Sequence, residues 1–322
     1  MNPNPVLELA FSQGQKYFDW LDSFHGPLDK PLVETIEKTC GIIWDRKGKR
    51  LRCHFVYWFS EPYKILHSEL ELYSWAVEAI HTATLLHDDV IDKAEIRRAG
   101  PSANQIFDNT IPVISGDYLM SDAIHQLAVK GHPDLLRGMC SALKQLTQGE
   151  ILQYESQFKI PENEETYRNI CKLKTASLLS WAASVGPTLS SSTEKPSVVS
   201  FAETYGLLYQ FTDDILDLKG TQTKNKNQDL NEGKLNWASW KVLEGDVSAR
   251  KKLEADFNRG TVTQDTVQAI SESFRAPSQQ RRLNSFLNEQ RQECQNLLSQ
   301  FGNSYLRQLL STLVDFTLSR IF

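Results

Sequence analysis

The stretch that decides the fold is EAIHTATLLHDDVID, residues Glu78–Asp92. Its apolar residues recur at helical spacing, and it ends in an Asp-Asp-x-x-Asp run. Because residues four apart share a helix face, Asp88 and Asp92 are stacked, and Asp89 is turned round the side. His81 lies two turns earlier on the Asp88 face. Two stacked carboxylates can share a hard cation such as Mg²⁺, which prefers oxygen ligands and keeps several waters.

These aspartates stand at the predicted C-terminal end of their helix, where the macrodipole disfavours negative charge. Such acids need a metal or basic partners, and two arginines, Arg97 and Arg98, follow them. The guanidinium fork matches phosphate oxygens, so the pattern is typical of a metal–diphosphate clamp. The alternative is a solvated helix end whose acids the arginines simply neutralise.

The segment YGLLYQFTDDILD, residues 205–217, repeats the design. Two acidic helix ends that face each other would hold metal ions between them, with a diphosphate as shared ligand. A glutamine and three aspartates recur at i, i+3, i+4 and i+7, on one helix face: Gln210, Asp213, Asp214 and Asp217. Basic residues follow again: Lys219, Lys224, Lys226 and Lys234.

Two smaller features are compatible with phosphate chemistry. The run GKRLR at 48–52 stands at a predicted helix start, and a basic helix N-terminus is a natural anion site. The alternative is an ordinary basic loop. Lys174 and Thr175 lie inside an otherwise apolar helix. The lysine either extends its charge outward to solvent or points into a polar site.

The bulk composition is that of an ordinary globular protein, with 322 residues, 40% hydrophobic and 23% charged. A net charge of −5 argues against nucleic-acid binding. Five scattered cysteines, an odd number without a C-x-x-C pair, predict reduced thiols. The N-terminus lacks signal-peptide features, and no apolar run is long enough to span a bilayer. We therefore expect a cytoplasmic protein without a transmembrane segment.

Helical periodicity runs through almost the whole chain, and no hairpin signal joins two alternating runs. The prediction is one all-helical domain over residues 1–322. The polar, lysine-rich segment 220–236 suits a loop or lid. The predicted helices, after a first apolar segment near the N-terminus, cover residues 32–44, 51–60, 70–92, 113–130, 133–158, 165–185, 197–218, 237–244, 249–258, 263–274, 278–301 and 304–319.

From residue 48 onward these motifs resemble the trans-isoprenyl diphosphate (polyprenyl) synthases. The resemblance implies a single-domain bundle of long helices around a deep central cavity, as a homodimer. It also implies an Mg²⁺-dependent enzyme that condenses isopentenyl diphosphate with an allylic diphosphate. The matching stretches, in order, are GKRLR at 48–52, EAIHTATLLHDDVID at 78–92, IRRAGPSAN at 96–104, GDYLMSDA at 116–123, KTA at 174–176, YQFTDDILD at 209–217 and DLNEGK at 229–234.

The resemblance implies a role for each matching residue. Mg²⁺ would be bound by Asp88, Asp92 and Asp213, with Asp89, Asp214 and Asp217 in support. The allylic diphosphate would be bound by Arg97 and Lys224. Isopentenyl diphosphate would be bound by Lys49, Arg52, His81 and Arg98, and Gly48 and Lys234 complete the substrate-binding set. The region where the carbocation forms would be lined by Lys174, Thr175 and Gln210.

The sequence also departs from the family pattern. Cys53 stands where proline is usual, and Ala99 replaces a glycine. The loop 224–229 lacks the usual glycines, and Leu235-Asn-Trp237 replaces a usual Thr-Leu-Pro. None of these changes removes a predicted metal ligand, but they leave loop closure and turnover open.

Two small residues, Ala83 and Thr84, lie one turn before Asp88, and Ile80, Ala79 and Ala76 lie a turn or two further back. In the family a bulky aromatic near this point shortens the product, so a small wall predicts six isoprene units or more. The alternatives are a medium-chain farnesyl or geranylgeranyl diphosphate synthase, a terpene cyclase, or a non-catalytic subunit of a heteromeric synthase. The second aspartate cluster and the basic run at 48–52 argue against the last two.

Overall fold

The computed structural model describes residues 5–18, 34–44, 48–97, 100–220 and 227–321. Helices dominate these residues, which confirms the predicted all-helical class. Contacts between residues divide the chain into two compact units. The first comprises residues 1–142 with 178–199, and the second comprises 143–177 with 200–322.

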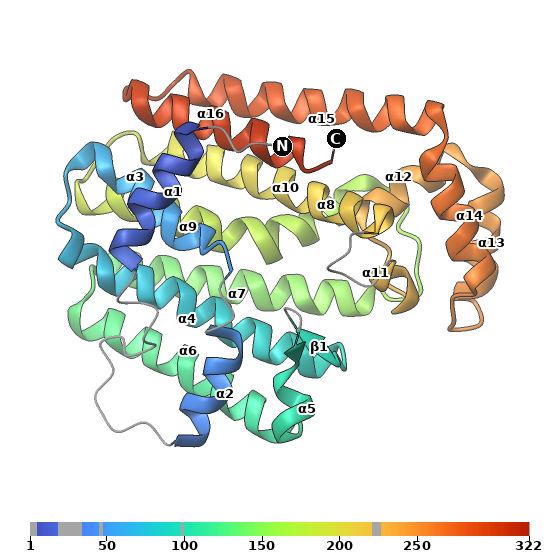
Figure 1. The fold of residues 1–322 in the computed structure, drawn as a ribbon, viewed down its shortest axis with the longest axis horizontal. Coiled ribbons are helices and arrows are strands. Elements are labelled where there is room, and N and C mark those ends of the chain that lie inside the picture. The colour runs from blue at the N-terminus through green and yellow to red at the C-terminus, as the bar shows by residue number, and fades with distance from the viewer. Residues whose placement is uncertain (1–4, 19–33, 45–47, 98–99, 221–226, 322) are drawn as a thin grey trace. The chain divides into compact units, whose positions relative to one another are not determined.

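The first unit is organised around α4, which packs along α6 and also contacts α2 and α3 (Figure 1). Its helices are α1 (Pro5–Phe18), α2 (Glu34–Trp44), α3 (Leu51–Ser60), α4 (His67–Ile91), α5 (Ala103–Phe107), α6 (Thr110–Lys130), the start of α7 (Pro133–Glu155), most of α9 (Ser177–Leu189) and the start of α10 (Lys195–Lys219), with a 3₁₀ turn, η2 (Glu61–Tyr63).

Small and apolar side chains allow α4 to lie close to its neighbours. Ala76, Ala79 and Ala83 are fully buried. Where α6 passes α4, a Cβ on Gly116 would come within 2.6 Å of the His87 ring. Nε2 of His87 lies 3.0 Å from the carbonyl oxygen of Val113, which can only accept, so this nitrogen carries the proton. Glycine thus makes room for the imidazole beside the first aspartate motif.

A short antiparallel hairpin follows α4, although the sequence carries no hairpin signal. β1 (Ile96–Arg97) pairs with β2 (Gly100–Pro101), with Ile96 opposite Pro101. Two residue pairs are too few to produce an alternating pattern. The hairpin base is closed by Ser102, whose backbone N–H donates to Glu95 O over 3.0 Å and whose hydroxyl donates to Ala94 O over 2.5 Å.

The second unit contains the remaining helices. In it α12 contacts α8, α13, α14 and α15, and α15 lies beside α16 (Figure 1). Its elements are the rest of α7, α8 (Glu164–Cys171), a π-helical turn, η3 (Lys172–Ala176), the rest of α10, α11 (Gln228–Asn231), α12 (Trp237–Gly245), α13 (Val247–Phe257), α14 (Gln264–Arg275), α15 (Pro277–Leu298) and α16 (Ser304–Ser319).

Side-chain caps mark the starts of several helices, of which α12 and α16 begin at the predicted residue and α13 begins two residues before it. Asn236 accepts from Ser239 N over 3.0 Å, Asp246 from Ala249 N over 2.9 Å, and Asn303 from Leu306 N over 2.8 Å. Each bond satisfies a backbone donor that the first helical turn leaves unpaired. The predicted helices 51–60 and 304–319 coincide with α3 and α16. The short helices α5 and α11 and the π turn η3 were not predicted.

All five cysteines are free, as predicted, and only Cys140 among them is exposed. Cys53, which departs from the family's proline, is buried in the first turn of α3. Its thiol donates to the carbonyl oxygen of Ser74 in α4 over 3.3 Å. No helix in the described ranges has the length and apolar character needed to cross a membrane.

Buried His54 makes the stability of the first unit dependent on pH. Its ring stacks on Trp58 with centroids 4.9 Å apart and meets Phe11 edge-on at 4.7 Å. Burial, and then the charge of Arg50, lower the pKa of His54 to about 3 from a usual 6.5. As pH falls below about 6.5, the His54 imidazole becomes protonated in the unfolded chain but stays neutral in the folded protein. His54 therefore supports folding fully above this pH and progressively less below it.

We expect the His54→Leu variant to lose part of the acid sensitivity of the wild type. Between about pH 6 and pH 4, the wild-type free energy of unfolding should fall by up to about 1.4 kcal/mol per pH unit more steeply than that of the variant. Urea unfolding at several pH values measures the difference, with carboxylate titration common to both proteins. Parallel pH profiles would contradict this assignment.

Candidate active site

Both aspartate motifs end long helices, as the sequence predicts. Asp88 lies in the last turn of α4, and Asp92 follows it as the C-cap, its backbone N–H donating to Asp88 O over 2.8 Å. Both side chains are partly exposed. In the second unit, Asp213, Asp214 and Asp217 lie in the last two turns of α10. Stability alone favours basic residues at such positions, so the placement points to function.

Asp89 is placed differently from its two neighbours. It is fully buried, and its Oδ1 accepts from Nε of Arg97 over 2.7 Å as well as from Nη2 of the same residue. The Arg97 side chain is 27% exposed and starts in the hairpin strand β1. Asp89 therefore fixes the direction of Arg97. Arg98, the second arginine of the predicted clamp, lies outside the described residues, as does Ala99.

The basic run before α3 divides into two kinds of residue. Gly48 and Lys49 are exposed and Arg52 is partly exposed, all near the helix start. Arg50 is instead 9% exposed, has a left-handed backbone with φ 43°, and lies over the Trp44 ring at 5.6 Å. Arg50 is thus a structural residue within the predicted anion site. On α4, His81 is partly buried, and its carbonyl accepts from the Thr84 hydroxyl over 2.8 Å.

Lys174 and Thr175 lie in the π-helical turn η3. Two glycines let neighbouring helices approach this turn. A Cβ on Gly149 of α7 would lie 2.7 Å from Lys174 Cγ, and one on Gly206 of α10 would lie 2.7 Å from Ala176 Cα. Nζ of Lys174 contacts the side chains of Glu150 and Gln153 on α7. The lysine is therefore held in a polar cluster rather than extended to solvent, and π turns recur at functional sites.

A line of hydrogen bonds joins this turn to the second aspartate motif. The Thr175 hydroxyl donates to Gln210 Oε1 over 2.7 Å, and Gln210 Nε2 donates to Asp214 Oδ1 over 2.9 Å. The other carboxylate oxygen of Asp214 accepts from the backbone N–H of Trp237 over 3.0 Å. Burial, together with the nearby carboxylate of Asp229, raises the pKa of Asp214 well above its usual range.

The two other aspartates of this motif have distinct partners. Asp213 Oδ1 accepts from Arg320 Nη2 over 2.7 Å, and the Arg320 guanidinium lies 5.1 Å from the Tyr209 ring centroid. Asp217 Oδ1 accepts from the backbone N–H of Gln228 over 3.3 Å, which fixes the start of α11. Lys234 Nζ, almost buried, lies 2.8 Å from Glu232 Oε2. Lys224 lies outside the described residues.

A model of the polyprenyl synthetase family matches residues 33–298. The chain belongs to this family. A prenyl transferase of Synechocystis is 29% identical over 249 residues, 76% of each chain. An octaprenyl diphosphate synthase of Escherichia coli is 36% identical over 163 residues, 49% of this chain and 50% of that protein. A Caulobacter crescentus polyprenyl synthase solved with calcium and isoprenyl diphosphate has a TM-score of 0.87 at 24% identity, covering 98% of this chain and 97% of that chain.

These likenesses confirm the predicted family, the all-helical class and a prenyl-transferring enzyme. The chain spans about half the length of the Escherichia coli relative it matches. The individual roles of the site residues in this polyprenyl synthetase stay predictions, because no comparison assigns them.

The donor set suits a hard divalent cation. Asp88 and Asp92 offer partly exposed carboxylate oxygens one helical turn apart. Within the part of the chain that the structure describes, no three His, Cys, Asp or Glu side chains gather as a complete metal cage. Mg²⁺ is usually held by one or two carboxylates, with waters and substrate phosphates as its other ligands. The arrangement of this polyprenyl synthetase therefore fits a cation that arrives with a diphosphate.

Sequence patterns did not reveal several partners of the predicted residues. Arg320 and Trp237 contact the second aspartate motif from further along the chain, and Glu150 contacts Lys174 from another helix. The sequence did carry one local signal for the start of α12, because asparagine, here Asn236, is common at helix N-caps. The others depend on how helices pack in this polyprenyl synthetase.

Proposed function

We propose that the protein condenses isopentenyl diphosphate with an allylic diphosphate to give an elongated trans-polyprenyl diphosphate. The observation that carries this proposal is the pair of aspartate motifs at the C-terminal ends of α4 and α10, in a chain of the polyprenyl synthetase family. Both motifs are complete, which favours elongation over a non-catalytic subunit and over a terpene cyclase. One family model spans residues 33–298, which supports a single catalytic domain.

The proposed metal is Mg²⁺, held by Asp88, Asp92 and Asp213. The Caulobacter crescentus enzyme, solved with calcium and isoprenyl diphosphate, supports a divalent cation. When bound, the cation would neutralise charge on the diphosphate that leaves. The proposed supporting role falls to Asp89, Asp214 and Asp217, because each is buried and accepts a hydrogen bond from another residue.

In the proposed reaction the allylic C–O bond breaks and its electron pair leaves with pyrophosphate. The isopentenyl double bond then attacks the allylic cation, and the resulting cation loses a proton to the released pyrophosphate, which forms the new trans double bond. Arg97 and Lys224 bind the allylic diphosphate, and the site for isopentenyl diphosphate is formed by Lys49, Arg52, His81 and Arg98. Gly48 and Lys234 complete the substrate-binding set. The region where the cation forms is lined by Lys174, Thr175 and Gln210, the last two ordered by their mutual hydrogen bond.

An elongation assay tests this function. Purified protein is incubated with isopentenyl diphosphate, a panel of allylic diphosphates and Mg²⁺, and products are read by mass spectrometry. Elongation with at least one primer, abolished by a chelator, is the expected result. A cyclic hydrocarbon formed without isopentenyl diphosphate would favour the cyclase reading instead.

The proposed product is long-chain, six isoprene units or more. The octaprenyl relative supports this length, although solved geranylgeranyl synthases share the fold, with a TM-score of 0.83 for one of them. Ala83, Ala79 and Ala76 are small and fully buried, and Thr84 is partly exposed. A prenyl tail that passes Ala83 and Ala79 meets two small side chains, while Ile80, also fully buried, lies one turn before Thr84.

Replacing Ala83 by Phe is expected to shorten the product by one or more isoprene units, because the ring fills the path of the tail. If the site is instead tightly packed protein, the extra volume should cost about 1–3 kcal/mol of stability and leave the product unchanged. Product mass and thermal unfolding of the same preparation separate the two results. An unaltered product length would show that this wall does not limit the chain.

A homodimer in the cytoplasm completes the proposal. Ile106 of α5 and Ile114 of α6 expose 47% and 53% of their surface. Apolar side chains of this kind suit contact with a second copy of the chain. Light scattering tests this. We expect a dimeric wild type and a monomeric Ile114→Glu variant. A monomeric wild type would contradict the proposal.

A further inference from the structure

Trp237 occupies a position where the sequence departs from the family pattern, yet it contacts Asp214. It is fully buried at the start of α12, and its backbone N–H donates to Asp214 Oδ2. The first N–H groups of a helix carry a partial positive charge and have no partner within the helix. The start of α12 therefore fixes one side of the Asp214 carboxylate, and Gln210 fixes the other.

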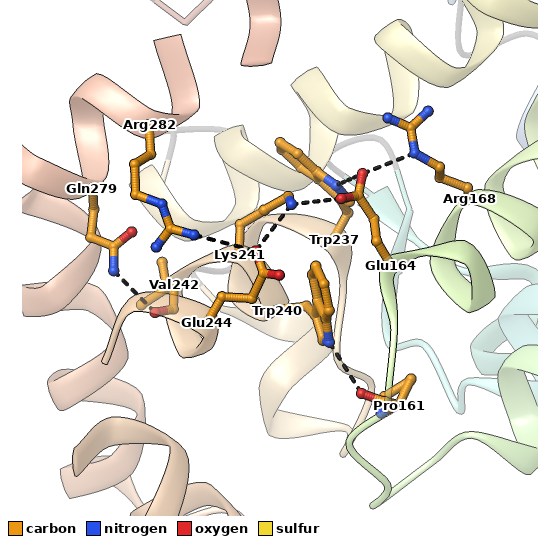
Figure 2. Close-up of polar contacts among 10 residues, drawn as sticks. All are labelled: Pro161, Glu164, Arg168, Trp237, Trp240, Lys241, Val242, Glu244, Gln279 and Arg282. Carbon is orange, nitrogen blue, oxygen red and sulfur yellow. Dashed lines mark hydrogen bonds and ion pairs between the residues drawn. The ribbon is translucent and has the colours of Figure 1, made fainter. Parts of the chain in front are cut away.

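Glu164 holds the other end of the same tryptophan. Its Oε1 accepts from the Trp237 indole N–H over 3.2 Å and from Arg168 Nε over 2.9 Å (Figure 2). Its Oε2 lies 2.6 Å from Lys241 Nζ on the next turn of α12. Although burial opposes ionisation of Glu164, the hydrogen bond and charge of Lys241 hold its pKa below the usual range. An ionised acceptor makes each of these bonds stronger than a neutral one.

Aromatic packing prevents Trp237 from turning away from this arrangement. Its ring lies 4.5 Å from the Phe211 ring of α10 and 4.5 Å from the Phe286 ring of α15. The Arg168 guanidinium lies over the same two phenylalanines, at 5.5 and 5.3 Å. A change at Glu164 is thus transmitted to the first turn of α12 through a rigid ring.

We propose that Glu164 is a positioning residue of the reaction, which acts through Trp237 to set Asp214 and, beyond it, Gln210 and Thr175. It touches neither substrate nor metal. Its function is to hold the second aspartate motif in the geometry that binds a cation with a diphosphate. The inference rests on the proposed metal-dependent elongation.

The test measures metal binding without turnover. Mn²⁺ binding is titrated calorimetrically in the presence of inorganic pyrophosphate for the wild type, Trp237→Phe, Glu164→Gln and Glu164→Ala. Trp237→Phe keeps an aromatic ring and the backbone N–H but removes the indole donor. We expect it, like Glu164→Ala, to weaken Mn²⁺ binding by about tenfold, the range found when outer partners of metal ligands are removed. The double variant that combines Trp237→Phe with Glu164→Ala should bind Mn²⁺ no more weakly than either single variant, because both substitutions break the same contact.

Trp240→Phe is the matched control. Trp240 lies on the same helix, is 5% exposed, and donates its indole N–H over the same 3.2 Å, but to the carbonyl oxygen of Pro161 (Figure 2). Its Mn²⁺ affinity should stay within twofold of the wild type. Equal affinities for Trp237→Phe and Trp240→Phe, or additive losses in the double variant, would overturn the proposal. If Glu164→Ala does not fold, Glu164→Gln, which keeps the volume and removes the charge, must show a weakened affinity.

The outcome separates this inference from the proposed function. If the wild type elongates a primer but Trp237→Phe and Trp240→Phe bind Mn²⁺ with equal affinity, only the role of Glu164 is refuted. A wild type that binds Mn²⁺ with pyrophosphate and shows the expected differences, but elongates no primer, refutes only the proposed function.

Discussion

Asp88→Asn is expected to reduce turnover about 100- to 1000-fold, the size of effect seen when one preorganised electrostatic group is removed from an active site. At the same time it should leave the protein as stable as before, or up to about 1 kcal/mol more stable, because it removes a negative charge from the C-terminal end of α4. A residue retained for stability would show the opposite pair of effects. The combination of lost activity and retained stability therefore identifies a functional carboxylate.

The measurements are steady-state elongation with saturating substrates and urea unfolding of the same preparations. Glu272→Gln is a suitable control, because Glu272 is an exposed acid in the last turn of α14 with no predicted role. It should show the small stability effect of a helix-end acid without any change in turnover. Wild-type turnover in Asp88→Asn, or a large loss of stability, would contradict the assignment.

The ion pair between Asp89 and Arg97 should respond asymmetrically to substitution. Arg97→Met leaves the fully buried Asp89 carboxylate without its guanidinium partner and should cost about 3–5 kcal/mol of stability. Asp89→Asn should cost less, about 1–3 kcal/mol, because Arg97 is 27% exposed and can turn its charge toward water.

A double-mutant cycle checks this account. Combining Asp89→Asn with Arg97→Met removes both charges, so the double variant should be more stable than Arg97→Met alone. Denaturant unfolding of the four proteins at neutral pH supplies the free energies. Equal losses for the two single variants, or simple additivity, would show that the pair is not the buried, coupled contact described here.

Features that depend on neighbouring residues in the chain could be predicted from sequence. The helical period and the acids at i, i+1 and i+4 place Asp88 and Asp213 at helix ends, and the structure agrees. The boundaries of α3 and α16 follow from local signals in the same way. For Asn303 the cap itself is visible in the sequence as a side chain that prefers this position.

Features that depend on packing between distant segments could not be predicted from the sequence. The contact of Asp213 with Arg320 joins residues 107 apart in the chain, and that of Trp237 with Glu164 joins residues 73 apart. The π turn that holds Lys174 arises where helices approach at Gly149 and Gly206, which no period reveals. In the sequence, Trp237 is one of the departures that leave loop closure and turnover open. In the structure, its backbone N–H donates to Asp214.

The most direct test of the central account is elongation with ¹³C-labelled isopentenyl diphosphate, an unlabelled allylic primer and Mg²⁺, with the product mass and the released pyrophosphate both measured. The account predicts one pyrophosphate for each labelled unit added, and a product of six isoprene units or more. Absence of labelled product with every allylic primer, from folded protein, would contradict it.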